Sequence, residues 1–176
     1  QNTTADVEIS FDEAIEGTER KIQVKRGDKV EKLTVKIPAG VDNGSKVRIA
    51  GKGQPGFGGG ASGDLYLVVR VTPHPKFWRE GADVYTEAPI TIYDAILGAS
   101  VEVLTLSGSA RMKIPAGTGS GQKFRMASKG APLLGKKGKR GDQFVIVKIV
   151  TPKHLTSDAV KAFEERAKKF PYEPRE

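Results

Sequence analysis

The sequence predicts a mostly β protein: two tandem β-sandwich-like domains of one repeated topology, each with a short helix, and a C-terminal α-helix after them. Three patterns support this fold class. They are a long internal repeat, an alternation of apolar and polar residues within each copy, and one helical stripe of apolar residues near the end. An apolar share of 38% supports packed cores, whereas the longest apolar runs have only strand length.

The repeat is clearest in two segments. Residues 36–53 read KIPAGVDNGSKVRIAGKG and residues 113–130 read KIPAGTGSGQKFRMASKG, with 11 of 18 positions identical. The likeness extends upstream, where SFDEAIEGTERKI corresponds to TIYDAILGASVEV, and downstream, where GDLYLVVRVTP corresponds to GDQFVIVKIVTP. A repeat of about 80 residues is too long for a solenoid unit. We expect a first β-domain at residues 1–80, a second at 81–155 with the junction near Arg79–Ala82, and a helix with a tail at 156–176.

Each copy begins with a short helical signal. Ser10 stands three residues before Glu13, and Thr91 stands three residues before Asp94. This spacing is typical of a capping box, and a glycine follows each segment where a helix would end. We therefore expect a helix of one to two turns that leads into a strand in each copy.

The segments after these helices show the period of β-strands. Ile22 and Val24 alternate with polar residues, and Leu33, Val35 and Ile37 do the same. The second copy repeats the pattern less cleanly. Such alternation indicates half-buried antiparallel strands.

The last segment has a helical period instead. Its apolar residues, at spacings of 3, 4 and 3, are Val160, Phe163, Ala167 and Phe170. Thr156 can cap this helix and Pro171 can end it. Two interpretations stay open: the helix is a lid on the core of the second domain, or it forms an interface with another chain.

Composition argues against several classes of protein. The absence of cysteine removes disulfides and thiolate metal sites and suits a reducing compartment, so we expect a cytoplasmic location. Two histidines are too few for a histidine-rich metal site, and the sequence shows no catalytic set of side chains. We expect a binding module rather than an enzyme, with no cofactor and no membrane span. The chain starts with Gln1 rather than methionine, so we expect an N-terminal portion to be missing.

The positive charge is concentrated in the second copy. The net charge is +8, and the stretch from Arg111 to Lys148 holds ten lysine or arginine residues against one acid, Asp142. A solvated loop that carries lysines explains this excess, and so does a phosphate-binding patch for nucleic acid. The candidate nucleic-acid contacts are Lys136, Lys137, Lys139 and Arg140.

The doubled pattern resembles the C-terminal substrate-binding region of DnaJ-type co-chaperones, the 40-kDa heat-shock family. The resemblance rests on DVEISFDEAIEGTERKI, on the two KIPAG segments, on GDLYLVVRVTPHPKFWREGADVYTEAPITIYDAILGASVEVLTL and on GDQFVIVKIVTP. It implies tandem β-domains, a dimerising C-terminus, and delivery of non-native proteins to a DnaK-type ATPase chaperone. Without cysteine the chain is similar to the zinc-free class, which includes curved-DNA binders, so nucleic-acid binding stays an alternative.

The resemblance also implies roles for particular residues. Peptide-groove positions of the family correspond to Val7, Ile9, Ile22, Val24, Val35 and Leu67. Basic contacts for the acidic C-terminal tail of the ATPase partner correspond to Arg20, Lys21 and Lys32. The dimer interface corresponds to Val160, Phe163, Ala167 and Phe170. For each apolar groove position an ordinary place in the core is the alternative.

Overall fold

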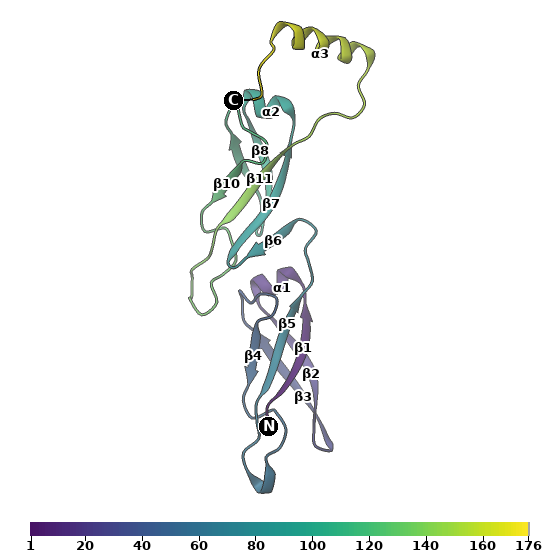
Figure 1. Cartoon of the computed structure of the whole chain (residues 1–176). Coiled ribbons are helices and arrows are strands. Elements are labelled where there is room, and N and C mark those ends of the chain that lie inside the picture. Colours follow the sequence, from purple (N-terminus) through teal and green to yellow (C-terminus); the bar gives the residue numbers. More distant parts are fainter. Residues whose placement is uncertain (176) are drawn as a thin grey trace.

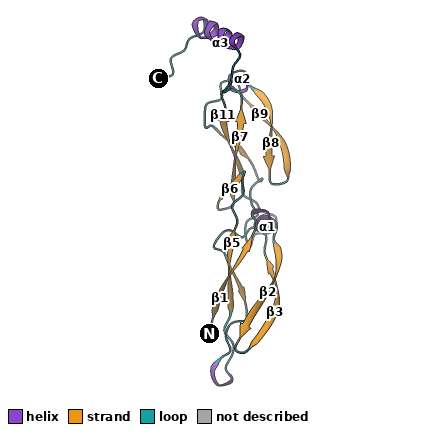
Figure 2. Ribbon diagram, turned by 90° about the vertical axis from the view of Figure 1, so that its right-hand side faces the viewer, coloured by secondary structure: helices purple, strands orange, loops and turns teal. Residues whose placement is uncertain are grey.

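The chain forms two β-domains stacked end to end, with a separate helix beyond the second (Figures 1 and 2). The structure is a computed structural model and describes residues 1–175. The N-terminus lies in the first domain, and the C-terminal helix lies at the opposite end of the molecule (Figure 1). The expected fold class, mostly β with two domains of one topology and a terminal helix, is confirmed.

The first domain pairs a three-stranded sheet with a β-hairpin. Its elements are β1 (Thr3–Ile9), α1 (Phe11–Glu16), β2 (Thr18–Arg26), β3 (Lys29–Ile37), β4 (Lys46–Ile49), the 3₁₀ turn η1 (Phe57–Gly59) and β5 (Leu65–Val71). The sheet has the order β1-β5-β4, and the hairpin is β2-β3. Their inner faces enclose one core, which contains Ile9, Ile37 and Leu67 among its fully buried side chains.

The second domain repeats this plan with one added strand. Its elements are β6 (Phe77–Glu80), β7 (Asp83–Ile90), α2 (Ile92–Leu97), β8 (Ala99–Thr105), β9 (Gly108–Ile114), β10 (Lys123–Met126) and β11 (Gln143–Ile149). The sheet has the order β10-β11-β7-β6, and the hairpin is β8-β9. The domain encloses a second core, which contains Ile114 and Val145.

The antiparallel strand pairing that the alternation of residues predicted is confirmed only in part. Both hairpins, β2-β3 and β8-β9, are antiparallel as expected. In contrast, β1 runs parallel to β5, and β7 runs parallel to β11. The alternation of side chains is the same in parallel and antiparallel strands, so it could not reveal these two pairings.

The added strand shifts the boundary between the domains. Residues 77–80, which the repeat assigned to the first domain, form β6 and pair antiparallel with β7 in the second sheet. The expected junction at Arg79–Ala82 therefore falls within a second-domain hairpin, at the end of β6 and in the turn to β7. We propose to place the division between Val71 and Phe77 instead.

Both short helices are capped as their sequences predict. The Ser10 hydroxyl accepts the Glu13 N–H at 3.1 Å, and the Glu13 carboxylate accepts the Ser10 N–H at 2.9 Å. Thr91 and Asp94 form the same reciprocal pair. Gly17 ends α1 with φ +83°, and a Cβ at this position would lie 3.0 Å from the backbone nitrogen of Ala39. The turn into β2 therefore requires glycine.

The domains meet through an apolar cluster and a buried arginine. Phe11 and Ile15 of α1 pack with second-domain side chains such as Phe77 and Val84. Nearby, the guanidinium of Arg79 donates hydrogen bonds across the junction to the carbonyls of Val41 and Gly40. These contacts fix α1 between the two domains.

The C-terminal helix α3 (Ser157–Lys169) is capped by Thr156, whose hydroxyl accepts the Ala159 N–H at 3.2 Å. None of its residues is buried, and Phe163 stacks on Tyr93 of α2 with ring centroids 6.4 Å apart. The interpretation of this helix as a lid on the second core is therefore wrong. None of the helices in the described part of the chain has the length and apolar character needed to cross a lipid bilayer.

Candidate peptide-binding site

The sheet and the hairpin of the first domain both have free strand edges, among them those of β1 and β2. Within residues 1–175, β1 pairs only with β5, and β2 pairs only with β3. In the second domain the strand equivalent to β1 is β7, and β6 covers its corresponding edge over Asp83–Thr86. An uncovered edge along the whole of β1 is thus a property of the first copy, whereas the edge of β2 is free in the same way as that of its counterpart β8, which pairs only with β9. Such an edge presents unpaired N–H and C=O groups to another extended chain.

The six predicted groove residues all belong to the core of the first domain or pack against it, and they differ in exposure. Val7, Ile9, Val35 and Leu67 are buried, and Leu67 is only 1% exposed. Ile22 and Val24 on β2 are half-buried and pack against that core. In this conformation the four buried side chains form core rather than groove wall, because a ligand cannot reach them. Among the six predicted residues, Ile22 and Val24 are the two that offer apolar surface beside the free edge.

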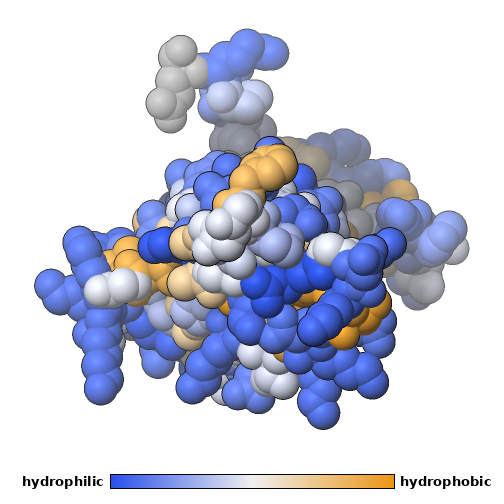
Figure 3. All heavy atoms as spheres, turned by 90° about the horizontal axis from the view of Figure 1, so that it is seen from below, coloured by the Kyte–Doolittle hydropathy of each residue, from blue (hydrophilic) through white to orange (hydrophobic). Residues whose placement is uncertain are grey.

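Apolar surface is sparse elsewhere on this domain. Seen from below, the molecule shows mostly hydrophilic residues, with apolar residues in small separate areas (Figure 3). The most exposed large apolar side chain here is Phe57, which lies in the glycine-rich loop before β5.

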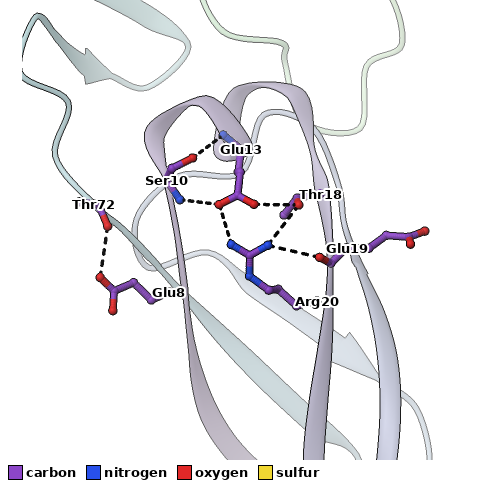
Figure 4. A network of polar contacts seen from close by, with 7 residues as sticks. All are labelled: Glu8, Ser10, Glu13, Thr18, Glu19, Arg20 and Thr72. Carbon is purple, nitrogen blue, oxygen red and sulfur yellow. Dashed lines mark hydrogen bonds and ion pairs between the residues drawn. The ribbon is translucent and has the colours of Figure 1, made fainter.

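Arg20, one of the three predicted tail contacts, is engaged within the domain (Figure 4). Its Nη2 lies 2.6 Å from Oε1 of Glu13, and the other Glu13 oxygen accepts the Thr18 hydroxyl at 3.0 Å. The Arg20 guanidinium, with the Ser10 N–H, lowers the pKa of Glu13 from 4.5 to about 2. Arg20 therefore joins α1 to β2 and lies on the inner side of the hairpin.

The other two tail contacts lie on the outer side of the same hairpin. Lys21 and Lys32 are exposed, and the alternation of the strands places Lys25 and Lys36 on the same side. We name these four lysines the basic hairpin face. Its one acidic residue is Glu19, which pairs in register with Lys36. Sequence reasoning missed Lys25 and Lys36, although the strand period that it identified places them there.

The four candidate nucleic-acid contacts lie in one ordered loop between β10 and β11. The Leu133 N–H donates to the Lys139 carbonyl at 2.8 Å, and the Lys136 N–H donates to the Leu133 carbonyl at 3.1 Å. Lys136, Lys137 and Lys139 are exposed, whereas Arg140 donates from Nε to the Gly130 carbonyl at 2.9 Å. Among residues 1–175, no group of three or more His, Asp or Glu side chains is arranged to hold a metal ion.

The predicted interface helix lies beside an exposed apolar end of the second domain. In α1 the inward residue Ile15 is 4% exposed because the second domain covers it. Its counterpart in α2, Ile96, is 63% exposed, and Tyr93 and Leu97 are exposed as well. Sequence reasoning missed this surface, although the aligned repeats place Ile96 opposite Ile15. The α3 stripe and the α2 end therefore lie close together, since Phe163 stacks on Tyr93.

Fold and topology together define a class, a tandem β-sandwich module that ends in a solvent-exposed helix. Comparison with known proteins then identifies the family. The model of the DnaJ C terminal domain matches residues 3–152, and the chain belongs to this family. The resemblance drawn from the repeated motifs is thereby confirmed.

Similar individual proteins include several named Chaperone protein DnaJ. The protein of Geobacillus thermodenitrificans strain NG80-2 is 50% identical over 137 residues, which are 78% of this chain and 36% of the relative. The protein of Roseiflexus sp. strain RS-1 is 47% identical over 143 residues, 81% of this chain and 38% of the relative. The chain thus spans little more than a third of the length of the curated relatives that it matches.

Proposed function

We propose that this chain is the client-binding part of a DnaJ-type co-chaperone. In this proposal it captures non-native polypeptides in extended form and delivers them to a DnaK-type ATPase chaperone in the cytoplasm. The observation that supports it most is the free edge of β2 beside the half-buried Ile22 and Val24. Membership of the DnaJ C-terminal domain family supports the same role.

The binding mode follows from the chemistry of the edge. An extended client adds as a further strand and exchanges backbone hydrogen bonds with β2, which carry no information about the client sequence. Alternate client side chains then contact Ile22 and Val24, which favour apolar residues. The result is broad selection for exposed apolar segments in extended conformation, as a chaperone requires.

Fluorescence anisotropy with a labelled, permanently unfolded polypeptide tests this site. The double variant Ile22→Ser, Val24→Ser should weaken binding by about 1–3 kcal/mol, and the loss should persist at high salt because the contacts are apolar. Gln23→Ser, on the outer face of the same strand, is the matched control and should bind like wild type. Unchanged affinity in a folded double variant would remove the groove from the proposal.

The basic hairpin face is our proposed site for the acidic C-terminal tail of the ATPase partner. Four exposed lysines attract a peptide that ends in several carboxylates, and salt should screen this attraction. Lys32→Glu should weaken the binding of such a peptide several-fold and leave the binding of an uncharged apolar client unchanged. Lys46→Glu, an equally exposed change on β4, is the control. Equal losses for both peptides would argue against a separate tail site.

We also propose that two chains pair through α3 and the apolar end of α2. Val160 and Phe170 on α3 are exposed, as is Ile96, and a two-fold contact would bury them on both chains at once. Two client sites on one particle gain avidity, because the second contact becomes intramolecular. Analytical ultracentrifugation of the intact chain and of a chain ending at Leu155 tests this. Equal monomer masses for both would refute the pairing.

Nucleic-acid binding is the second candidate function. It rests on the ten basic residues and one acid between Arg111 and Lys148, with Lys136, Lys137, Lys139 and Arg140 as contacts. Binding of this kind should weaken steeply with salt and should not compete with an apolar peptide. Charge neutralisation of Lys136 and Lys137 should lower the salt dependence, and an unchanged salt dependence would exclude these contacts.

A further inference from the structure

The two copies of the repeat have the same local contacts at their short strands β4 and β10 and in the turns that follow these strands. Arg48 lies 2.7 Å from Asp64, and Arg125 lies 2.7 Å from Asp142. The second oxygen of each aspartate accepts a backbone N–H three residues beyond the arginine, at 2.9 Å in both copies. The copies can therefore be compared position by position in this region.

A guanidinium occupies the same place in both copies, although it comes from different elements. In the first domain, Arg26 at the end of β2 donates from Nε to the Gly53 carbonyl at 3.2 Å. In the second domain, Arg140 of the β10–β11 loop donates from Nε to the equivalent carbonyl, that of Gly130, at 2.9 Å. A lysine precedes each of these glycines by one residue, Lys52 in the first copy and Lys129 in the second.

In the first domain, one carboxylate neutralises both Lys52 and Arg26. Oxygens of Glu31 lie 2.6 Å from Lys52 Nζ and 3.0 Å from Arg26 Nη1. These two contacts, that of Lys52 foremost, lower the pKa of Glu31 below its ordinary value. The carboxylate is thus held as an anion between the lysine and the arginine.

The second domain lacks a carboxylate at the position of Glu31 that would neutralise Lys129 and Arg140. Strands β2 and β3 have nine residues each, whereas β8 and β9 have seven. The hairpin therefore turns earlier, and the position of Glu31 falls on Gly108 at the start of β9. Among residues 1–175, neither Lys129 nor Arg140 has an ion pair with a carboxylate.

The shorter hairpin also leaves space. A cleft of about 480 Å³ opens at its turn, between the two domains. Ile15, Ala39, Leu106 and Pro132 give it apolar walls, and Ser107, Ser128, Lys129 and Arg140 line its polar side. This size lies within the range of ligand sites, ~300–1,000 Å³, and domain interfaces are common places for them.

Ser128 adds a sign of strain at the same place. It is the one non-glycine residue within 1–175 with positive φ, at +60°, whereas its counterpart in the first copy is Gly51 at φ +70°. A side chain in this region costs about 1–2 kcal/mol. The second copy carries that cost and gains a hydroxyl in the lining of the cleft.

We propose that this cleft binds an acidic residue of an extended polypeptide, flanked by an aliphatic residue. The ligand carboxylate takes the place between Lys129 and Arg140 that Glu31 occupies in the first copy, and the aliphatic side chain contacts Leu106 and Pro132. Glu16 of α1 also lines the cleft and repels the ligand. The site is separate from the β2 edge and from the basic hairpin face, so it gives the chain a further contact with acidic polypeptides.

NMR titration of the ¹⁵N-labelled chain tests the proposal. The probe is the peptide Ala-Leu-Glu-Leu-Ala, blocked at both ends, and its Gln analogue is the uncharged control. The Glu peptide should shift the amides of Ser107, Ser128 and Lys129, and the Gln peptide should bind roughly 10-fold more weakly, which corresponds to one charge-assisted hydrogen bond. Shifts confined to the basic hairpin face would overturn the assignment.

Variants locate the contacts. Lys129→Gln with Arg140→Gln should weaken binding of the Glu peptide at least 10-fold, whereas Lys113→Gln with Lys123→Gln, two exposed lysines of the same domain outside the cleft, should change this affinity less than twofold. Glu16→Gln should strengthen binding, because it removes a repulsive charge. If the double variant at Lys129 and Arg140 keeps native chemical-shift dispersion and binds the Glu peptide with unchanged affinity, the proposal is refuted. Isovalerate, a small organic acid, should bind more weakly than the peptide, and equal affinity would exclude a polypeptide as the ligand.

Discussion

Removal of the guanidinium of Arg79 should loosen the junction between the two domains. Its side chain is 6% exposed, and it donates to the carbonyls of Val41 at 2.6 Å and Gly40 at 3.2 Å. Asp42 lies 3.9 Å away, so carbonyl oxygens rather than a close carboxylate satisfy the buried charge. This burial lowers the pKa of Arg79, and the residue stays charged because an arginine pKa lies far above neutrality.

The size of the effect follows from these contacts. Arg79→Met keeps most of the packed volume but removes two charge-assisted hydrogen bonds across the junction, to Val41 and Gly40, and a third to the nearby Gly81 carbonyl. Each such bond contributes about 1.5–3 kcal/mol, and relief of the buried charge offsets part of the loss. We expect the free energy of unfolding to fall by about 2–4 kcal/mol.

Guanidinium chloride unfolding monitored by Trp78, the single tryptophan of the chain, measures this change next to the junction. Arg70→Met is the matched control, because Arg70 and its partner Asp6 are 54% and 63% exposed. It should cost less than about 0.5 kcal/mol. If the two variants unfold at the same denaturant concentration, the apolar cluster alone holds the domains together and the role of Arg79 is refuted.

Three further changes test the rest of the fold. Acidification from the ordinary Glu13 pKa of 4.5 to about 2 should remove about 1 kcal/mol of stability, since protonation breaks the pair with Arg20; a Glu13→Gln chain should lack this loss in acid titrations of unfolding. Gly17→Ala should cost about 1–3 kcal/mol in thermal unfolding, more than Gly44→Ala, whose added Cβ meets nothing within 4 Å. Leu67→Ala should cost about 2–5 kcal/mol in denaturant unfolding because its side chain is fully buried, and a loss below 1 kcal/mol would contradict its place in the core.

Some features of the protein follow from the sequence alone. The capping pairs join residues three apart, so Ser10 with Glu13 and Thr91 with Asp94 could be identified before any tertiary contact was known. In the hairpin strands, side chains alternate between the two faces because of backbone geometry alone. The 3-4-3 spacing of apolar residues likewise predicted the helix α3 from local geometry. The internal repeat then made the topology of one domain a prediction for the other, and its motifs identified the family.

Tertiary structure decided what these elements do together. The burial of Leu67, the inward turn of Arg20 toward Glu13 and the cover of β6 on the edge of β7 each depend on segments distant in the chain. The same holds for the cleft at Lys129, because it arises where a shortened hairpin and the neighbouring domain meet. Local bonds are encoded within a few residues, whereas exposure and charge pairing depend on which distant segments pack against each residue.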